Sequence, residues 1–174
     1  MAQLALTDQQ KIQIASANGI IRADEVFALA KKTGIPFYIG CAYLEQETSG
    51  GKNVFGSDEG PPGKMRGIEM MQPENLGSRD VTEMLYKVYR MQRPDLGAQG
   101  VGPLQATYPD WQDEIDRAGG CWVWEVNVEK GFELIMEFKA TRTWDQVALR
   151  WNGGTVFVDH NRELRQEWRD RLNG

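Results

Sequence analysis

A glutamate in a setting suited to proton donation stands at position 47, where an apolar stretch runs into glycine. The stretch is 36–47, and the residues that follow it, 48–51, are Thr-Ser-Gly-Gly. A carboxyl group in the last turn of a buried helix, facing a glycine-rich loop, is half out of water. Partial desolvation raises the pKa of such a glutamate, so that it can donate a proton near neutral pH. We therefore expect Glu47 to be the chemical centre of the protein.

Two glycine-containing turns follow Glu47 along the chain. They are Gly-Val-Gly-Pro-Leu-Gln at 100–105 and Trp-Asn-Gly-Gly at 151–154. Taken alone, the first could be an ordinary turn, and the second more often ends a helix than forms a site. Their order and type behind a helix-ending glutamate indicate a glycan-cleaving enzyme.

Helices must position these residues, because capping and periodicity signals recur along the chain. Thr7 with Gln10 and Thr143 with Gln146 form capping boxes. Apolar residues at helical spacing occupy most of the intervals between the breakers. The sequence predicts a helix opening at Thr7 and further helices over 22–32, 36–47, 80–91, 109–118, 126–139, 143–151 and 159–172, with a loop beginning at Arg93-Pro94.

A long segment without clear periodicity, 48–79, separates the third helix from the fourth. It contains seven glycines and three prolines, and a short β element is expected at 53–55. Loops of this length are usually lids or cleft walls. We therefore predict an α+β, mostly α fold: one domain over 1–174, with Glu47 at the floor of a cleft between a helical lobe and a small β/loop lobe.

The composition excludes several functional classes. Apolar residues make up 41% and charged residues 26% of the 174, as in a globular protein, and no apolar run approaches a membrane span. The net charge of −5 argues against general nucleic-acid binding. A single histidine, His160, disfavours a zinc peptidase, which takes two or three histidine ligands. No cofactor is expected.

The three motifs together resemble those of soluble lytic transglycosylases and goose-type lysozymes. These enzymes carry a helix-ending Glu followed by Ser or Thr, then a Gly-Leu-Met-Gln-like turn and a Tyr-Asn-Gly/Ala-Gly-like turn. The runs 47–58 and 100–108, with Ala-Gly-Gly-Cys at 118–121, are similar to the glycosidase domain of endolysins from phages of actinobacteria. The resemblance spans about residues 36–155 and implies a lysozyme-like fold.

The resemblance also implies an activity and roles for residues. The activity is cleavage of the β-1,4 bond between N-acetylmuramic acid and N-acetylglucosamine in peptidoglycan, with Glu47 as the general acid that protonates the leaving oxygen. The turn at 102–105 would hold an N-acetyl sugar by backbone groups and the Gln105 amide. The turn beginning at Trp151 would pack against the glutamate. The expected substrate-binding set is Gly102, Leu104, Gln105, Thr107, Tyr108, Trp151, Asn152 and Gly153.

The chain departs from the family pattern at the second catalytic carboxylate. Goose-type enzymes place an aspartate soon after the first turn, whereas this chain has no carboxylate there until Asp110. Asp58 is our candidate, with Glu59 and Glu69 as alternatives, and Thr107 could position water instead. Both hydrolysis and formation of an anhydro sugar stay open.

The implied protein is a monomeric phage endolysin whose partner is the peptidoglycan glycan strand. Without a visible signal peptide, it would be made in the host cytoplasm and act on the cell wall, with no nucleic-acid partner and no membrane insertion. Two alternatives remain. One is a non-catalytic, lysozyme-like wall-binding module, and the other is a cysteine peptidase or amidase that uses Cys121 or Cys41 with His160. A bridge between the two cysteines also stays open.

Overall fold

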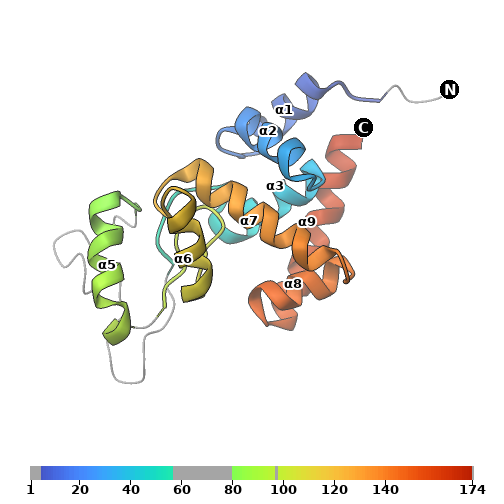
Figure 1. Ribbon diagram of the computed structural model, residues 1–174. Coiled ribbons are helices and arrows are strands. Elements are labelled where there is room, and N and C mark those ends of the chain that lie inside the picture. The colour runs from blue at the N-terminus through green and yellow to red at the C-terminus, as the bar shows by residue number, and fades with distance from the viewer. Residues whose placement is uncertain (1–4, 57–79, 97, 174) are drawn as a thin grey trace. The chain divides into compact units, whose positions relative to one another are not determined.

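Helices dominate the chain in the computed structural model, which describes residues 5–56, 80–96 and 98–173 (Figure 1). Within these ranges the only β pairing is a pair of isolated bridges. The mostly helical class predicted from the sequence is confirmed. The helices are α1 Asp8–Ala17, α2 Ala23–Thr33, α3 Phe37–Thr48, α5 Glu83–Leu96, α6 Pro109–Ala118, α7 Trp124–Lys139, α8 Trp144–Asn152 and α9 Thr155–Asn173.

The chain divides into two compact units. The first unit comprises 1–51 and 128–174, and the second comprises 52–127. Each has buried apolar side chains of its own. The single domain over 1–174 stays a prediction.

Helix α3 runs through the interior of the first unit, packed chiefly against α9 and also against α2. Its residues from Ile39 to Leu44 are all buried, which explains why its sequence is apolar on every side. A Cβ at Gly40 would lie 2.8 Å from the Phe132 ring, so this position lets α7 approach closely. The prediction that this helix is buried is confirmed within the first unit.

Polar side chains fix the rotation of α3 against α9. Trp168 Nε1 donates to Glu45 Oε2 at 2.5 Å. Gln46 Nε2 donates to the Phe157 carbonyl at 2.9 Å, and its Oε1 accepts from Asn161 at 2.7 Å. Because these contacts come from the last turns of α3, they also set the direction in which Glu47 points.

The second unit contains α5, α6 and three short segments that two β-bridges connect. Val54 pairs with Asp80 and Phe55 with Val101, both antiparallel, so the β element expected at 53–55 is present as isolated bridges. Phe55 lies in an apolar cluster to which α5 contributes two tyrosines. The buried members of the cluster are Phe55, Val81, Tyr86, Tyr89, Val101, Ala106, Ile115 and Cys121.

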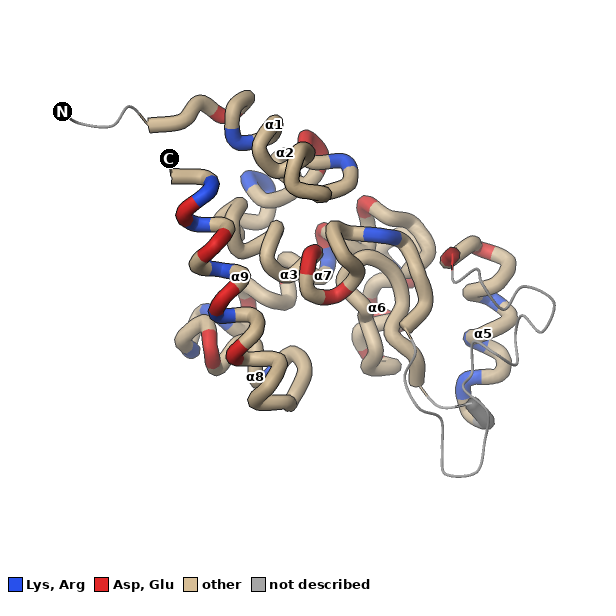
Figure 2. The backbone as a smooth tube through the Cα atoms, turned by 180° about the vertical axis from the view of Figure 1, so that it is seen from behind, with Lys and Arg blue, Asp and Glu red and all other residues tan. Residues whose placement is uncertain are grey.

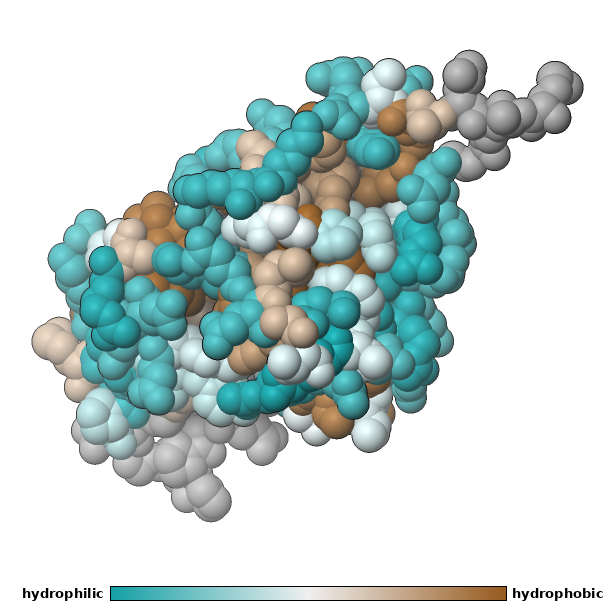
Figure 3. Space-filling view, turned by 45° about the vertical axis from the view of Figure 1, so that its right-hand side comes forward, coloured by the Kyte–Doolittle hydropathy of each residue, from teal (hydrophilic) through white to brown (hydrophobic). Residues whose placement is uncertain are grey.

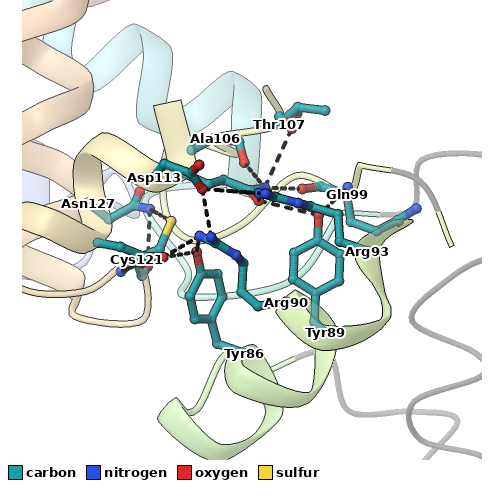
Figure 4. A network of polar contacts seen from close by, with 12 residues as sticks. Tyr86, Tyr89, Arg90, Arg93, Gln99, Ala106, Thr107, Asp113, Cys121 and Asn127 are labelled. Carbon is teal, nitrogen blue, oxygen red and sulfur yellow. Dashed lines mark hydrogen bonds and ion pairs between the residues drawn. The ribbon is translucent and has the colours of Figure 1, made fainter. Parts of the chain in front are cut away.

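One predicted boundary is wrong, because α5 continues through Arg93-Pro94 to Leu96. Proline inside a helix removes one backbone hydrogen bond, and its ring crowds the preceding turn. Side-chain contacts to α6 hold this turn: Arg93 donates to Gln112 at 3.0 Å, and Arg90 pairs with Asp113 at 2.7 Å (Figure 4). We infer that this tertiary anchoring overrides the local preference.

Other predicted boundaries shift by a few residues. Helix α6 has the bounds that the sequence predicts, whereas α7 begins two residues early, at Trp124. Helix α9 begins at Thr155 instead of 159, directly after the glycines that end α8. Both capping boxes are present, at Thr7 and Thr143.

The surface is mostly hydrophilic in the view of Figure 3, with scattered apolar patches. The exposed large hydrophobic side chains include Met84, Met91 and Val156. Among the helices within the described ranges, none combines the length and apolarity that a membrane crossing requires.

An ion-pair network joins α8 to α9 inside the first unit. Asp145 Oδ2 lies 2.8 Å from Arg162 and Oδ1 lies 2.5 Å from Arg165. Figure 2 shows the alternation of basic and acidic positions along α9. The two guanidinium groups lower the pKa of Asp145 below its ordinary value, chiefly through the hydrogen bonds from Arg162.

We therefore predict that Asp145→Asn lowers the free energy of unfolding at pH 7 by about 1 kcal/mol, a value that allows for solvent screening at a partly exposed site. A lowered pKa stabilises the fold above the unfolded-state value of about 3.9, and this stabilisation is lost as the pH falls through the folded-state value. The difference between the variant and the wild type should shrink below about pH 4. Denaturant titrations from pH 3 to 7 check this, and a constant difference would contradict it.

Candidate functional site

Glu47 lies half-buried in the last turn of α3. Its Oε1 accepts a hydrogen bond of 2.9 Å from Nε1 of Trp151, the penultimate residue of α8. Trp151 is only 6% exposed, so its ring is held by packing. Since an indole N–H can only donate, this contact fixes one carboxyl oxygen as an acceptor.

The backbone beyond Glu47 turns sharply and is fixed to a neighbouring loop. Ser49 adopts a left-handed conformation and its amide donates to the Glu45 carbonyl at 2.9 Å, as in an αL cap, and the Gly50 amide donates to the Leu44 carbonyl at 2.9 Å. The Gly50 carbonyl accepts from Ile21 at 2.9 Å. A Cβ at Gly50 would lie 2.0 Å from the Gly19 carbonyl oxygen, so only glycine fits there. The glycines after Glu47 thus set the end of α3.

The turn at 152–154 carries Trp151 into this arrangement. Asn152 ends α8 and is exposed, and Gly153 caps the helix with φ +83°. Its amide donates to the Leu149 carbonyl at 2.7 Å. The chain then enters α9, where the Phe157 carbonyl accepts from Gln46, the neighbour of Glu47. The expected packing of the Trp151 turn against the glutamate is therefore present.

Tyr43, one helical turn before Glu47, is a residue that the sequence analysis missed. Its ring meets Trp151 edge-on at 5.9 Å, and its side chain is fully buried. Its hydroxyl has no hydrogen-bond partner among the described residues. Burial raises the pKa of Tyr43, with opposing contributions from Arg165 and Glu47. The spacing of four residues on α3 was the available signal, because it places Tyr43 and Glu47 on one helix face.

The turn at 100–105 lies in the second unit and is held together by its own polar groups. Gln105 is left-handed, with φ +49°. Its Nε2 donates to the Val54 and Gly102 carbonyls, each at 2.9 Å. Because both hydrogens of Nε2 are donated to backbone carbonyls, only Oε1 of this amide could form a hydrogen bond with a sugar. Leu104 is buried, so its side chain supports the turn from within.

Two fully buried polar side chains hold this turn and escaped the sequence analysis. Asn127 Oδ1 accepts from the Leu104 amide at 3.2 Å, and its Nδ2 donates to the Val101 and Cys121 carbonyls at 3.1 and 3.2 Å. Gln112 Nε2 donates to the Gln99 and Ala106 carbonyls at 2.8 and 2.7 Å (Figure 4). The only sequence signal for this role was at Asn127, a polar residue within a helical pattern of apolar residues.

The remaining residues predicted to bind substrate follow directly after the turn. Thr107 Oγ1 donates to the Gln105 carbonyl at 2.9 Å. Tyr108 is 48% exposed, stands at the N-cap of α6 and packs edge-on against Trp111 with ring centroids 4.6 Å apart. A partly exposed aromatic pair of this kind can stack on a sugar ring.

The structure therefore brings together some of the predicted residues. Glu47, Trp151, Asn152 and Gly153 belong to the first unit, whereas 102–108 belong to the second. Asp58 and its alternatives Glu59 and Glu69 lie outside the described residues. Their proposed catalytic roles stay predictions.

Both cysteines are buried and unbridged, which settles the open question of a disulfide. Burial raises the pKa of the Cys41 thiol well above its ordinary value and that of Cys121 to about 12. His160 is exposed and lies 3.9 Å from Glu163. A nucleophilic cysteine needs an accessible thiolate, so these geometries disfavour the cysteine peptidase alternative.

Within the described ranges, no cluster of three or more His, Cys, Asp or Glu residues is arranged to hold a metal ion.

Comparison of the chain with protein-family models, with curated proteins and with solved structures found no match in any of the three. The resemblance to goose-type lysozymes and lytic transglycosylases therefore depends on the sequence motifs alone.

We predict that neither thiol reacts readily in the folded protein. At pH 8, labelling by a neutral aromatic disulfide should be more than about 100-fold slower than in guanidinium-unfolded chain, because both thiols are buried and protonated. The absorbance of the aromatic thiolate that the reagent releases gives the labelling rates. Stoichiometric labelling of Cys121 within the mixing time would contradict its burial. It would favour the alternative in which the protein is a cysteine peptidase or amidase.

Proposed function

We propose that the protein cleaves peptidoglycan glycan strands with Glu47 as the general acid. The observation that carries the proposal is the hydrogen bond from Trp151 to Glu47 at the half-buried end of α3. It holds a carboxyl group in one orientation at the end of a helix that glycines terminate. The motif order around this pair, which resembles lytic transglycosylases and goose-type lysozymes, supports a lysozyme-like fold with a cleft.

The hydrogen bond gives the two carboxyl oxygens of Glu47 different roles in this proposal. Oε1 is held by the indole, so Oε2 is the oxygen that carries the proton to the glycosidic oxygen. The indole cannot accept a proton, and it therefore orients the acid without competing for the proton. Glycoside cleavage passes through an oxocarbenium-like state, in which protonation of the leaving oxygen lowers the barrier.

The substrate class follows from the same motif order. We propose the β-1,4 bond between N-acetylmuramic acid and N-acetylglucosamine as the target, with the backbone of the 102–105 turn and the Tyr108–Trp111 pair contacting sugar. In this proposal the protein is a phage endolysin that acts as a monomer on the cell wall. Asp58 is the proposed second carboxylate. Mass spectrometry of the digest distinguishes hydrolysis, which leaves reducing ends, from transglycosylation, which leaves anhydro ends.

We predict that Glu47→Gln lowers wall lysis by at least ~100-fold, the scale of positioned acid catalysis. The amide still accepts from Trp151 but has no proton to transfer. Turbidity loss of purified peptidoglycan measures the rate, and unchanged circular dichroism shows that the fold is retained.

Glu45→Gln is the matched control, because Glu45 sits two residues earlier on α3 and also accepts from an indole, that of Trp168. Lysis by this variant should stay within about threefold of wild type, since it leaves the proposed acid intact. Near wild-type lysis by Glu47→Gln, with wall binding retained, would refute the catalytic assignment and favour the non-catalytic wall-binding module.

Trp151→Phe tests positioning separately from acidity. The phenyl ring preserves most of the packing against Tyr43 but removes the donor, so kcat should fall about tenfold, the scale of one lost hydrogen bond, while KM changes little. Initial rates measured with soluble glycan oligomers as substrates give kcat and KM. The comparison variant is Trp168→Phe, which removes the donor to Glu45 and leaves the contact between Trp151 and Glu47 in place. An equal loss of kcat there would show that the effect comes from the placement of α3 and not from the hydrogen bond to Glu47.

A further inference from the structure

Tyr43 is a buried polar side chain whose hydroxyl has no part in the proposed chemistry. The side chain is fully buried in the first unit, and its hydroxyl has no hydrogen-bond partner among the described residues. Burying a hydroxyl without a partner destabilises a fold, whereas a phenylalanine in the same place would carry no such cost. A tyrosine here is therefore expected to have a partner other than the described protein groups.

A second buried polar atom without a partner belongs to α9, the helix that packs most extensively against α3. It is Oδ1 of Asn161, a fully buried residue. The other polar groups of Asn161 are engaged, because Nδ2 donates to Gln46 Oε1 at 2.7 Å and the carbonyl accepts from Arg165 Nε at 3.3 Å. An amide oxygen can only accept, whereas a tyrosine hydroxyl can donate. The two unsatisfied atoms are thus chemically complementary.

Two relations indicate that these atoms belong to the same part of the α3–α9 interface. Tyr43 precedes Gln46, the partner of Asn161, by three residues, and this spacing places the two side chains on one face of α3. Burial raises the pKa of Tyr43, and among the charged groups Arg165, which bonds to Asn161, has the largest effect, in the opposite direction. Tyr43 and Asn161 therefore share both a helix face and a charged neighbour.

We propose that one internal water molecule joins the Tyr43 hydroxyl to Asn161 Oδ1, and that Tyr43 thereby acts as a positioning residue for Glu47. The water accepts a hydrogen bond from the hydroxyl and donates one to the amide oxygen, so that both buried atoms are satisfied. Because Gln46 and Arg165 already hold Asn161, the hydroxyl is anchored to a fixed point on α9.

The anchored tyrosine acts on Glu47 through Trp151. The two aromatic rings meet edge-on, with centroids 5.9 Å apart and planes at 76°, and Trp151 donates to Glu47 at 2.9 Å. A ring attached to α3 at one end and bonded to α9 at the other has little freedom to move away from the indole. The inference rests on the proposed function, since Glu47 needs one orientation only if it is the acid.

Tyr43→Phe tests the proposal, because it removes the hydroxyl and keeps the ring. The readout is hydrogen exchange of the Trp151 indole N–H, followed by NMR of the isotope-labelled full chain and assigned by the signal lost in Trp151→Phe. We expect this exchange to become about fivefold faster, the scale of one lost hydrogen bond. The indole of Trp168, which donates to Glu45 on the same helix, is the internal control and should change less than about twofold.

Asn161→Ala tests whether the hydroxyl acts through Asn161. In this background, adding Tyr43→Phe should leave the Trp151 exchange rate within about twofold, because the shared water is already lost. Tyr89→Phe is the matched control for removing a buried hydroxyl. That hydroxyl lies in the second unit and accepts from the Gln99 amide at 2.9 Å, so its loss should leave the Trp151 exchange rate within about twofold.

Three results would overturn the proposal. A Trp151 exchange rate that does not change in Tyr43→Phe would show that the hydroxyl has no influence on the indole. Equal acceleration at Trp151 and Trp168 would show a general loss of stability. A higher urea midpoint for Tyr43→Phe would show that the hydroxyl is buried without a partner. Because no substrate is present, retained lysis by Glu47→Gln would refute the acid assignment and leave these exchange results unaffected.

Discussion

One hydrogen bond, from the Trp151 indole to the Glu47 carboxyl group, carries the functional interpretation of this structure. It joins residues that are 104 positions apart in the chain, and it forms only because α3 and α8 are both packed in the first unit. The donor is nearly buried and cannot rotate freely, so the acceptor is held as well. A half-buried carboxyl group in the last turn of a helix otherwise has little reason to keep one orientation. The buried Tyr43 ring supports the donor from the side.

A hydrogen bond from an indole N–H to a glutamate carboxyl group occurs twice on α3. Glu45 and Glu47 each accept from an indole, Trp168 and Trp151 respectively, while Gln46 between them bonds to α9. Three consecutive polar side chains on a buried helix point in different directions, because successive residues are rotated by about 100° around the axis. We infer that the first two contacts lock the helix rotation and leave the third residue to meet Trp151. The structural acid Glu45 and the proposed catalytic acid Glu47 are thereby separated by position, although both accept from an indole.

The second unit uses buried amides for a comparable purpose. Asn127 and Gln112, neither of them exposed, bond to backbone groups of the segment 99–106. A turn with few repeating hydrogen bonds needs such partners, since an unpaired buried peptide group is costly. Gln105 completes the arrangement by bonding within the turn. The turn is therefore held rigid by side chains from two helices, a suitable condition for a surface that binds by its backbone.

The sequence by itself determined the helical class, most helix ranges and both capping boxes, because these depend on local periodicity, capping and glycine placement. It could not show that α5 passes through Pro94, since contacts from Arg90 and Arg93 to α6 decide that. Nor could it identify Tyr43, Asn127 or Gln112, which acquire their roles from neighbours distant in the chain. The pairing of Trp151 with Glu47 and the burial of both thiols were likewise decided by tertiary packing. Local signals record the preference of each segment, whereas side-chain partners exist only once the segments are packed together.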